Sequence, residues 1–306
     1  MNPSKELIPV VTTLDAGYLQ HCAVMLGSLF KNNPTYNFHI YIIISFADNN
    51  DLQKLKSFVT NYQHALEIVR IDDKEINNFQ TVHHITTATY YRLLIPGLLP
   101  VSINKVLYLD VDVIIRRDIS DLWNTNIENY SVAAVMEPMF TRHAKLNIPK
   151  EANYFNAGVL LMNLEKWRKN DTTRQILTFI DKNNGSLEML EQDALNAILY
   201  DQWLCLPFVW NVTSVLFTAT AKELHIDESE LINVITNPCI IHYTGYSKPW
   251  HYTNTHPFKK EYYKYLQLTP WKNFKHPEET VWHKIKQSGK KLMNLAYGRK
   301  KFEVYN

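Results

Sequence analysis

Glycine is scarce in this sequence, with only eight glycines among 306 residues. Neither GxGxxG nor GxxxxGK[ST] occurs, which excludes the glycine-rich loops that commonly cradle nucleotide phosphates. If the protein binds a nucleotide, other groups must therefore balance the phosphate charge.

Cysteines, long apolar runs and an excess of one charge are also lacking. The three cysteines, Cys22, Cys205 and Cys239, form no CxxC pair, which argues against a disulfide framework or a zinc ribbon. No run of about 18 apolar residues occurs, and the apolar stretch before Asp15 is too short for a signal peptide. Thirty-two basic against 30 acidic residues exclude the basic excess of a nucleic-acid-binding protein. We therefore expect a cytoplasmic protein with no nucleic-acid partner.

Apolar and polar residues alternate between strand-like and helix-like patterns, and 46% of all residues are hydrophobic. Strands are predicted at 8–14, 38–46, 65–71, 105–110 and 131–136, with helices at 18–31 and 51–66 between the first ones. This order is typical of a parallel sheet covered by helices on both faces. Further strands are predicted at 155–164, 203–210 and 238–244, and further helices at 165–184 and 188–200.

Two parts of the chain are distinguished by composition. Residues 1–268 contain no repeat or low-complexity linker, which predicts one continuous domain. Residues 269–306 are expected to form a basic, partly amphipathic helical extension, with seven lysines and arginines from Lys284 to Lys301. Such a segment either lies on an anionic membrane surface or packs on the domain as a solvated terminal helix.

Two carboxylates, Asp110 and Asp112, stand one residue apart inside the apolar stretch YLDVDVIIRRD, where they close the strand predicted at 105–110. Side chains at i and i+2 of an extended segment point to one side, so two carboxylates there can chelate a hard divalent cation. Strand ends are also where open α/β sheets bind ligands. The alternative is a pair of strand-end carboxylates that accept hydrogen bonds from turn amides.

Other polar residues follow predicted strands in the same way. Asp15 is either a helix N-cap or, with Thr13 and Tyr18, part of a pocket for a base and ribose. His242 is either a core histidine or a metal ligand, and the nearby Gly245 and Lys248 favour a ligand beside a phosphate. One imidazole with two carboxylates suits Mn²⁺, with Mg²⁺ as the alternative.

Four linked motifs make the sequence similar to a known family. In order, YLDVDVIIRRD, YFNAGVLLMNLEKWR, LEQDALN and HYTGYSKPW resemble the retaining glycosyltransferases of family 8, which include bacterial lipopolysaccharide galactosyl- and glucosyltransferases and glycogenin. The similarity covers about residues 7 to 265. It implies a GT-A fold, meaning a Rossmann-like, mostly parallel sheet flanked by helices, and a UDP-hexose donor.

The resemblance also implies roles for individual residues. Asp110, Asp112 and His242 would hold Mn²⁺, and the donor would be contacted by Thr13, Asp15, Tyr18, Arg92, Asp110, Val111, Asp112, Glu137, Asn156, Ala157, Gly245 and Lys248. Glu191 and Gln192 fall at catalytic positions beside the donor sugar. The family usually has alanine at the position of Thr13, often asparagine at Gly17 and often aspartate at Glu191, so the base contacts and the shape of the sugar pocket are expected to differ.

Some of these residues have simpler interpretations. Residues 156–158 could form a turn into the following strand, and Glu191 with Gln192 could be the exposed first turn of a helix. His84 could contact an acceptor sugar or be an ordinary loop histidine, and Trp250 could stack on a sugar or pack internally.

The implied reaction is transfer of galactose or glucose from a UDP-sugar, with retention, to a saccharide on a lipid or protein carrier. Lipopolysaccharide, capsule or glycoprotein assembly at the inner face of the cytoplasmic membrane would use such an enzyme. Because an amide is a poor nucleophile, Gln192 favours same-face attack in which the UDP oxygen takes the acceptor proton. A metal-dependent nucleotide-sugar hydrolase or phosphodiesterase and a non-catalytic glycan-binding protein are the alternatives.

Overall fold

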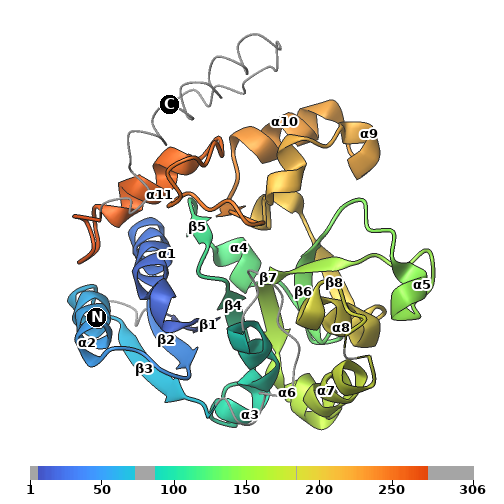
Figure 1. Ribbon diagram of the computed structural model, residues 1–306, viewed down its shortest axis with the longest axis horizontal. Helices are drawn as coiled ribbons and strands as arrows, with labels where there is room; N and C mark the ends of the chain where they lie inside the picture. The colour runs from blue at the N-terminus through green and yellow to red at the C-terminus, as the bar shows by residue number, and fades with distance from the viewer. Residues whose placement is uncertain (1–5, 73–86, 184, 275–306) are drawn as a thin grey trace.

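A mixed seven-stranded sheet forms the centre of the protein (Figure 1). The computed structural model describes residues 6–72, 87–183 and 185–274. The strand order is β3-β2-β1-β4-β7-β6-β8, with β1 (Leu7–Thr13), β2 (Asn37–Ile44), β3 (Ala65–Arg70), β4 (Lys105–Leu109), β6 (Val132–Met136), β7 (Phe155–Asn163) and β8 (Trp203–Leu206). Only β7 runs antiparallel to its neighbours, β4 and β6. The mostly parallel sheet of the predicted fold class is confirmed.

A second, two-stranded sheet lies beside the first and was not predicted. It pairs β5 (Val113–Ile115) with β9 (Ile240–His242) in antiparallel register, so that Val113 lies opposite His242. This pairing brings the segment after β4 next to a strand more than a hundred residues later in the chain. Predicted strand 238–244 is therefore shorter than expected, and 203–210 ends at Leu206.

Helices cover both faces of the large sheet. One face carries α1 (Leu19–Asn32), after the 3-10 turn η1 (Ala16–Tyr18), and α2 (Asn49–Asn61). The other carries η3 (Thr87–Leu94), α3 (Ile95–Leu98), α6 (Leu164–Lys169), α7 (Thr172–Lys182) and α8 (Leu190–Leu199). The remaining elements are α4 (Ser120–Trp123), α5 (His143–Leu146), η4 (Phe208–Trp210), η5 (Ser214–Phe217), α9 (Ala221–Leu224), α10 (Glu228–Thr236) and α11 (Lys259–Leu266).

The core has one layer on each side of the sheet because successive strand residues point to opposite faces. In β1, Val10 packs with α1 and α2, whereas Val11 packs on the η3 and α8 side, and both are fully buried. A strand buried on both faces reads as a continuous apolar run, which is why β1 and β2 were recognisable in the sequence.

Two predicted helices have different bounds in the structure. The predicted helix 165–184 is two helices, α6 and α7, because Asp171 adopts a left-handed conformation with φ of 51°. Aspartate tolerates this conformation better than most residues. The predicted helix 51–66 ends at Asn61, and Gln63, with φ of 61°, turns the chain into β3.

The last described residues still pack on the domain. Trp271 and Phe274, beyond the predicted boundary at 268, lie against a third cluster formed around Tyr262 and Tyr265 of α11. From residue 275 onward, the basic extension predicted for 269–306 lies outside the described residues. His84, the candidate acceptor contact, also lies outside them. Among the helices described, none has the length and apolar character needed to cross a bilayer.

Candidate active site

A cavity of about 450 Å³ opens where the strands of the parallel half of the sheet end. Its walls contain nearly all the residues singled out in the sequence, namely Thr13, Asp15, Tyr18, Arg92, Asp110, Val111, Asp112, Glu137, Asn156, Glu191, Gln192, His242, Gly245 and Lys248. Of the residues predicted to contact the donor or the metal, Ala157 alone does not line the cavity, and its side chain is buried. The fold thus joins residues from seven separate segments in one cleft.

The two aspartates lie in a turn rather than in the extended strand that was predicted. β4 ends at Leu109, and residues 110–112 lead directly into β5. Both carboxylates still face the same space, with side chains 22% and 12% exposed. The short turn between β4 and β5 therefore places both carboxylates on one side, as the i, i+2 spacing was expected to do.

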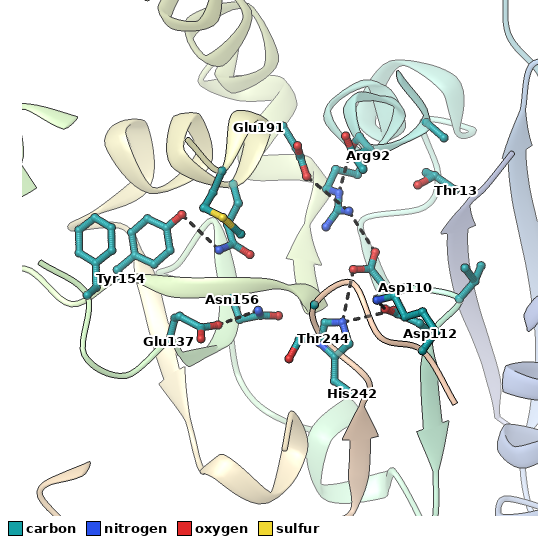
Figure 2. A pocket seen from close by; sticks show the side chains of 18 of the residues that line it. Thr13, Arg92, Asp110, Asp112, Glu137, Tyr154, Asn156, Glu191, His242 and Thr244 are labelled. Atoms are coloured by element: carbon teal, nitrogen blue, oxygen red, sulfur yellow. Dashed lines mark hydrogen bonds and ion pairs between the residues drawn. The ribbon is translucent and has the colours of Figure 1, made fainter. Parts of the chain in front are cut away.

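His242 completes a group of three ligand-type side chains (Figure 2). Its Nε2 atom lies 3.3 Å from Asp112 Oδ1 and 3.8 Å from Asp110 Oδ2. One ligand atom from each residue falls within 4.8 Å of the others. Two carboxylates and one imidazole at this spacing match the ligands that a divalent cation such as Mn²⁺ prefers.

The hydrogen bonds around His242 fit a metal ligand. Its Nδ1 atom lies 2.9 Å from the Oδ1 atom of Asn211, which is fully buried. An amide oxygen can only accept, so Nδ1 carries a proton, and in the neutral ring the Nε2 lone pair faces the carboxylates. A lone pair and two negative groups converge on one point, an arrangement that a bound cation satisfies.

Gly158 makes room for this group. A methyl added at its Cα would lie 2.2 Å from His242 Cε1 and 2.9 Å from Asp110 Oδ2. These distances are well below an ordinary contact, so only a glycine in β7 lets both ligands approach the strand this closely.

Arg92 connects the aspartates to the opposite wall. The guanidinium is buried, lies 3.0 Å from Asp110 and 3.5 Å from Glu191, and donates to the Ala157 carbonyl at 2.6 Å. Burial by itself would lower the pKa of Arg92, but the surrounding acidic groups, Asp110 above all, outweigh it and raise the pKa. Its positive charge is therefore permanent and fixed in place.

Lys248 supplies a second cation at the end of the cavity that holds Asp112. Its Nζ atom donates to Asp112 Oδ2 and, at 2.8 Å, to the carbonyl of Tyr243. The loop that carries it turns at Gly245, whose φ of +84° favours glycine. Burial would raise the pKa of Asp112, but Lys248 and His242 outweigh this effect, so the pKa falls below its usual value.

The wall away from Asp110, Asp112 and His242 carries one partly buried acid, Glu137, and one buried acid, Glu191. Glu137 accepts a hydrogen bond from Asn156 Nδ2 at 2.8 Å, and burial raises the pKa of Glu137. Glu191 is 5% exposed, and its Oε2 atom has no hydrogen-bond partner among the described residues. Burial also raises the pKa of Glu191, against the opposing effect of Arg92. Glu191 Oε2 is thus a buried acceptor that the described residues leave unpaired.

Gln192 is held at both ends of its amide. Its Oε1 atom accepts from the Ala157 N–H at 2.9 Å, and its Nε2 atom donates to the Tyr154 hydroxyl at 3.2 Å. That hydroxyl donates to the buried Asp193 at 2.8 Å, which also accepts from Arg142. The buried positions of Glu191 and Gln192 rule out an exposed first helical turn, and residues 156–158 lie within β7 rather than in a turn.

The simpler interpretations of two other residues are now decided. Asp15 precedes η1, but its side chain makes no capping hydrogen bond and faces the cavity. Trp250 packs internally, with its ring stacked on His21 at a centroid distance of 3.6 Å. Thr13, at the end of β1, makes a hydrogen bond of 3.1 Å with the Tyr108 hydroxyl.

Four residues near the cavity were not recognised in the sequence: Asn211, Gly158, Tyr154 and Asp193. Tyr154, Gly158 and Asp193 lie within the quoted motifs YFNAGVLLMNLEKWR and LEQDALN, so proximity to a predicted site residue was an available signal. Asn211 lies in none of the motifs, and no local pattern indicates it.

Comparison with known proteins agrees with this geometry. The model of glycosyl transferase family 8 matches residues 9–254. The chain belongs to glycosyl transferase family 8. General stress protein A of Bacillus subtilis is 31% identical over 278 residues, covering 89% of this chain and 97% of that protein. Lipopolysaccharide 1,2-glucosyltransferase of Escherichia coli is 30% identical over 275 residues, covering 88% and 80%.

Solved structures show the same fold. The galactosyltransferase LgtC, in complex with donor and acceptor sugar analogs, superposes with a TM-score of 0.79 at 21% identity, covering 90% of this chain and all of that one. The bifunctional glycosyltransferase WbbM gives a TM-score of 0.73 over 89% of this chain and 52% of its own length. The predicted family and the GT-A fold are confirmed, and the protein is a family 8 glycosyltransferase.

Proposed function

We propose that this family 8 glycosyltransferase transfers galactose or glucose from a UDP-sugar to a saccharide acceptor, with retention of configuration and with Mn²⁺ as its cation. The observation that supports this best is the convergence of Asp110, Asp112 and His242, whose Nε2 lone pair faces both carboxylates. When bound there, the ion would neutralise charge on the leaving diphosphate.

Two cationic side chains, Lys248 and Arg92, suit the diphosphate and the sugar of such a donor. Lys248 lies at the metal end, where its ammonium group can neutralise a diphosphate oxygen. Arg92 lies between Asp110 and Glu191, where the donor sugar would follow the diphosphate. Glu191 lines the cavity beside Arg92, where a carboxylate suits a sugar hydroxyl, which is a donor.

The carboxylates near Gln192 are poorly placed to act as a nucleophile. Asp193 is 1% exposed and its oxygens accept from Arg142, Tyr154 and two backbone N–H groups. Glu191 is paired with Arg92. We therefore favour attack by the acceptor on the face that the diphosphate leaves, with a diphosphate oxygen taking the acceptor proton and the Gln192 carbonyl stabilising positive charge on the sugar.

The test is UDP release from a panel of UDP-sugars with Mn²⁺, Mg²⁺ or chelator, followed by the same assay with candidate saccharide acceptors. We expect release to require the cation and to increase when the correct acceptor is added. Cation-dependent release that no saccharide increases would instead favour a nucleotide-sugar hydrolase. Saccharide binding that is indifferent to chelator, without UDP release, would favour a glycan-binding protein.

We further propose that the acceptor is carried by a lipid or protein at the inner face of the cytoplasmic membrane. The support is the charge of the C-terminal segment, which contains Lys290, Lys291, Lys300 and Lys301. Changing these four lysines to glutamate should release the full-length protein from vesicles containing anionic lipid and leave UDP release in solution unchanged. Equal vesicle binding by both proteins would refute this part of the proposal.

A further inference from the structure

From His242 a series of hydrogen-bonded side chains leads away from Asp110 and Asp112, and we call it the amide relay: Glu137, Asn156, Asn211 and His242. Asn156 donates to Glu137 at 2.8 Å, Asn211 donates to Asn156 Oδ1 at 2.9 Å, and His242 Nδ1 lies 2.9 Å from Asn211 Oδ1. Asn156, Asn211 and His242 are each at most 6% exposed. The relay therefore links the sugar end of the cavity to the metal end without using solvent.

The direction of every bond in the relay is fixed by one backbone group. The N–H of Gly158 donates to Asn156 Oδ1 at 3.0 Å, and a peptide N–H can only donate. Asn156 must therefore present its oxygen to Asn211, and Asn211 donates to it from its NH₂ group. The Asn211 oxygen is left to face His242, so Nδ1 must be the protonated ring nitrogen.

The backbone also holds Asn211 in register with His242. Asn211 follows η4, and the next residue, Val212, donates to Ile240 at 2.9 Å and accepts from the His242 N–H at 3.0 Å. The backbone at Asn211 is thus held beside β9, the strand that carries the His242 imidazole. Because this backbone is already fixed, Asn211 loses little further conformational entropy when its side chain holds the ring.

From this geometry we propose that Asn211 is a positioning residue for the cation site: it keeps Nδ1 of His242 protonated and the Nε2 lone pair aimed between Asp110 and Asp112. The proposal rests on the proposed metal dependence and adds to it a residue that touches neither the cation nor the donor. Partners of this kind typically change metal affinity by about 10- to 100-fold when removed.

The experiment measures Mn²⁺ binding by electron paramagnetic resonance in the absence of any donor, so it does not depend on activity. Asn211→Leu keeps the branched shape of the side chain but removes both the acceptor for His242 Nδ1 and the donor to Asn156, and should weaken Mn²⁺ binding about 10- to 100-fold. Asn211→Asp keeps an acceptor for Nδ1 and should bind Mn²⁺ within about threefold of the parent, or more tightly, because a carboxylate makes the imidazole more basic.

Asn33→Leu is the matched control, because Asn33 is also fully buried and, among the described residues, its side chain bonds only to the backbone of Leu29, Arg117 and Ile119. It should lower the melting temperature without changing Mn²⁺ affinity, which separates loss of stability from loss of the cation site. Parent-like binding by Asn211→Leu, or an equal loss in Asn211→Leu and Asn211→Asp, would overturn the positioning role. A parent protein that binds no Mn²⁺ would instead refute the proposed metal dependence, and the positioning role with it.

Discussion

Gly158→Ala is the substitution whose effect on the site the structure defines most sharply. The added methyl would lie 2.2 Å from His242 Cε1, and an ordinary contact begins at 3.4 Å, so the ring must retreat by about 1.2 Å, the difference between these values. The ring has little room to do so, since it is 4% exposed and hydrogen-bonded to Asn211. Metal ligands are held to within about 0.2 Å of their ideal distance. The methyl group should therefore remove His242 from the cation site.

Two quantities should change together. Forcing a methyl into a packed region costs about 1–3 kcal/mol of unfolding free energy, which lowers the melting temperature by several degrees. Mn²⁺ affinity should fall by more than about tenfold, because one of three protein ligands is displaced. Chemical denaturation measures the first quantity, and electron paramagnetic resonance of Mn²⁺ measures the second.

Gly97→Ala is the matched control, because a methyl at Gly97 would have no atom within 4 Å. Alanine there should leave stability unchanged or raise it by up to about 1 kcal/mol, since Gly97 lies in α3. If Gly158→Ala bound Mn²⁺ as tightly as Gly97→Ala does, the close approach of His242 to β7 would be refuted.

Three further predictions concern chemistry and pH. Asp110→Asn, like a chelator, should reduce UDP release by about 100-fold or more, because several kcal/mol of charge stabilisation are lost; Mn²⁺-stimulated release by the variant would contradict this. Tyr154→Phe leaves the Gln192 Nε2 atom unpaired and should lower kcat about tenfold with little change in the donor KM, whereas unchanged kcat would exclude a positioning role for this hydroxyl. Burial lowers the pKa of His21 to about 3, so the unfolded state binds an extra proton between pH 6.5 and 3 and stability is lost as the pH falls through this range. In urea unfolding over this range, His21→Gln should reduce the pH dependence by up to about 1.4 kcal/mol per pH unit, and an unchanged slope would show that His21 is protonated in the fold.

The parts of the fold that sequence patterns predicted are those in which apolar residues and burial coincide. β1 and β2 are buried on both faces, and α1 is buried at every residue from His21 to Phe30, so each left a recognisable apolar pattern. β5 was missed because its three residues follow the Asp110 to Asp112 turn without a break in the apolar pattern. The division of α6 from α7 depends on the backbone of Asp171, which no hydrophobic pattern reports.

For the candidate site, the sequence by itself determined which ligand-type groups are available: Asp110 and Asp112 by their spacing, and His242 by its place after an apolar run. Only the tertiary structure decided how they are aimed. Asn211 reaches His242 across 31 residues, and Gly158 admits the imidazole from a different strand. The physical reason is that residue type and spacing are properties of a segment, whereas the direction of a lone pair depends on hydrogen bonds between segments that only folding brings together.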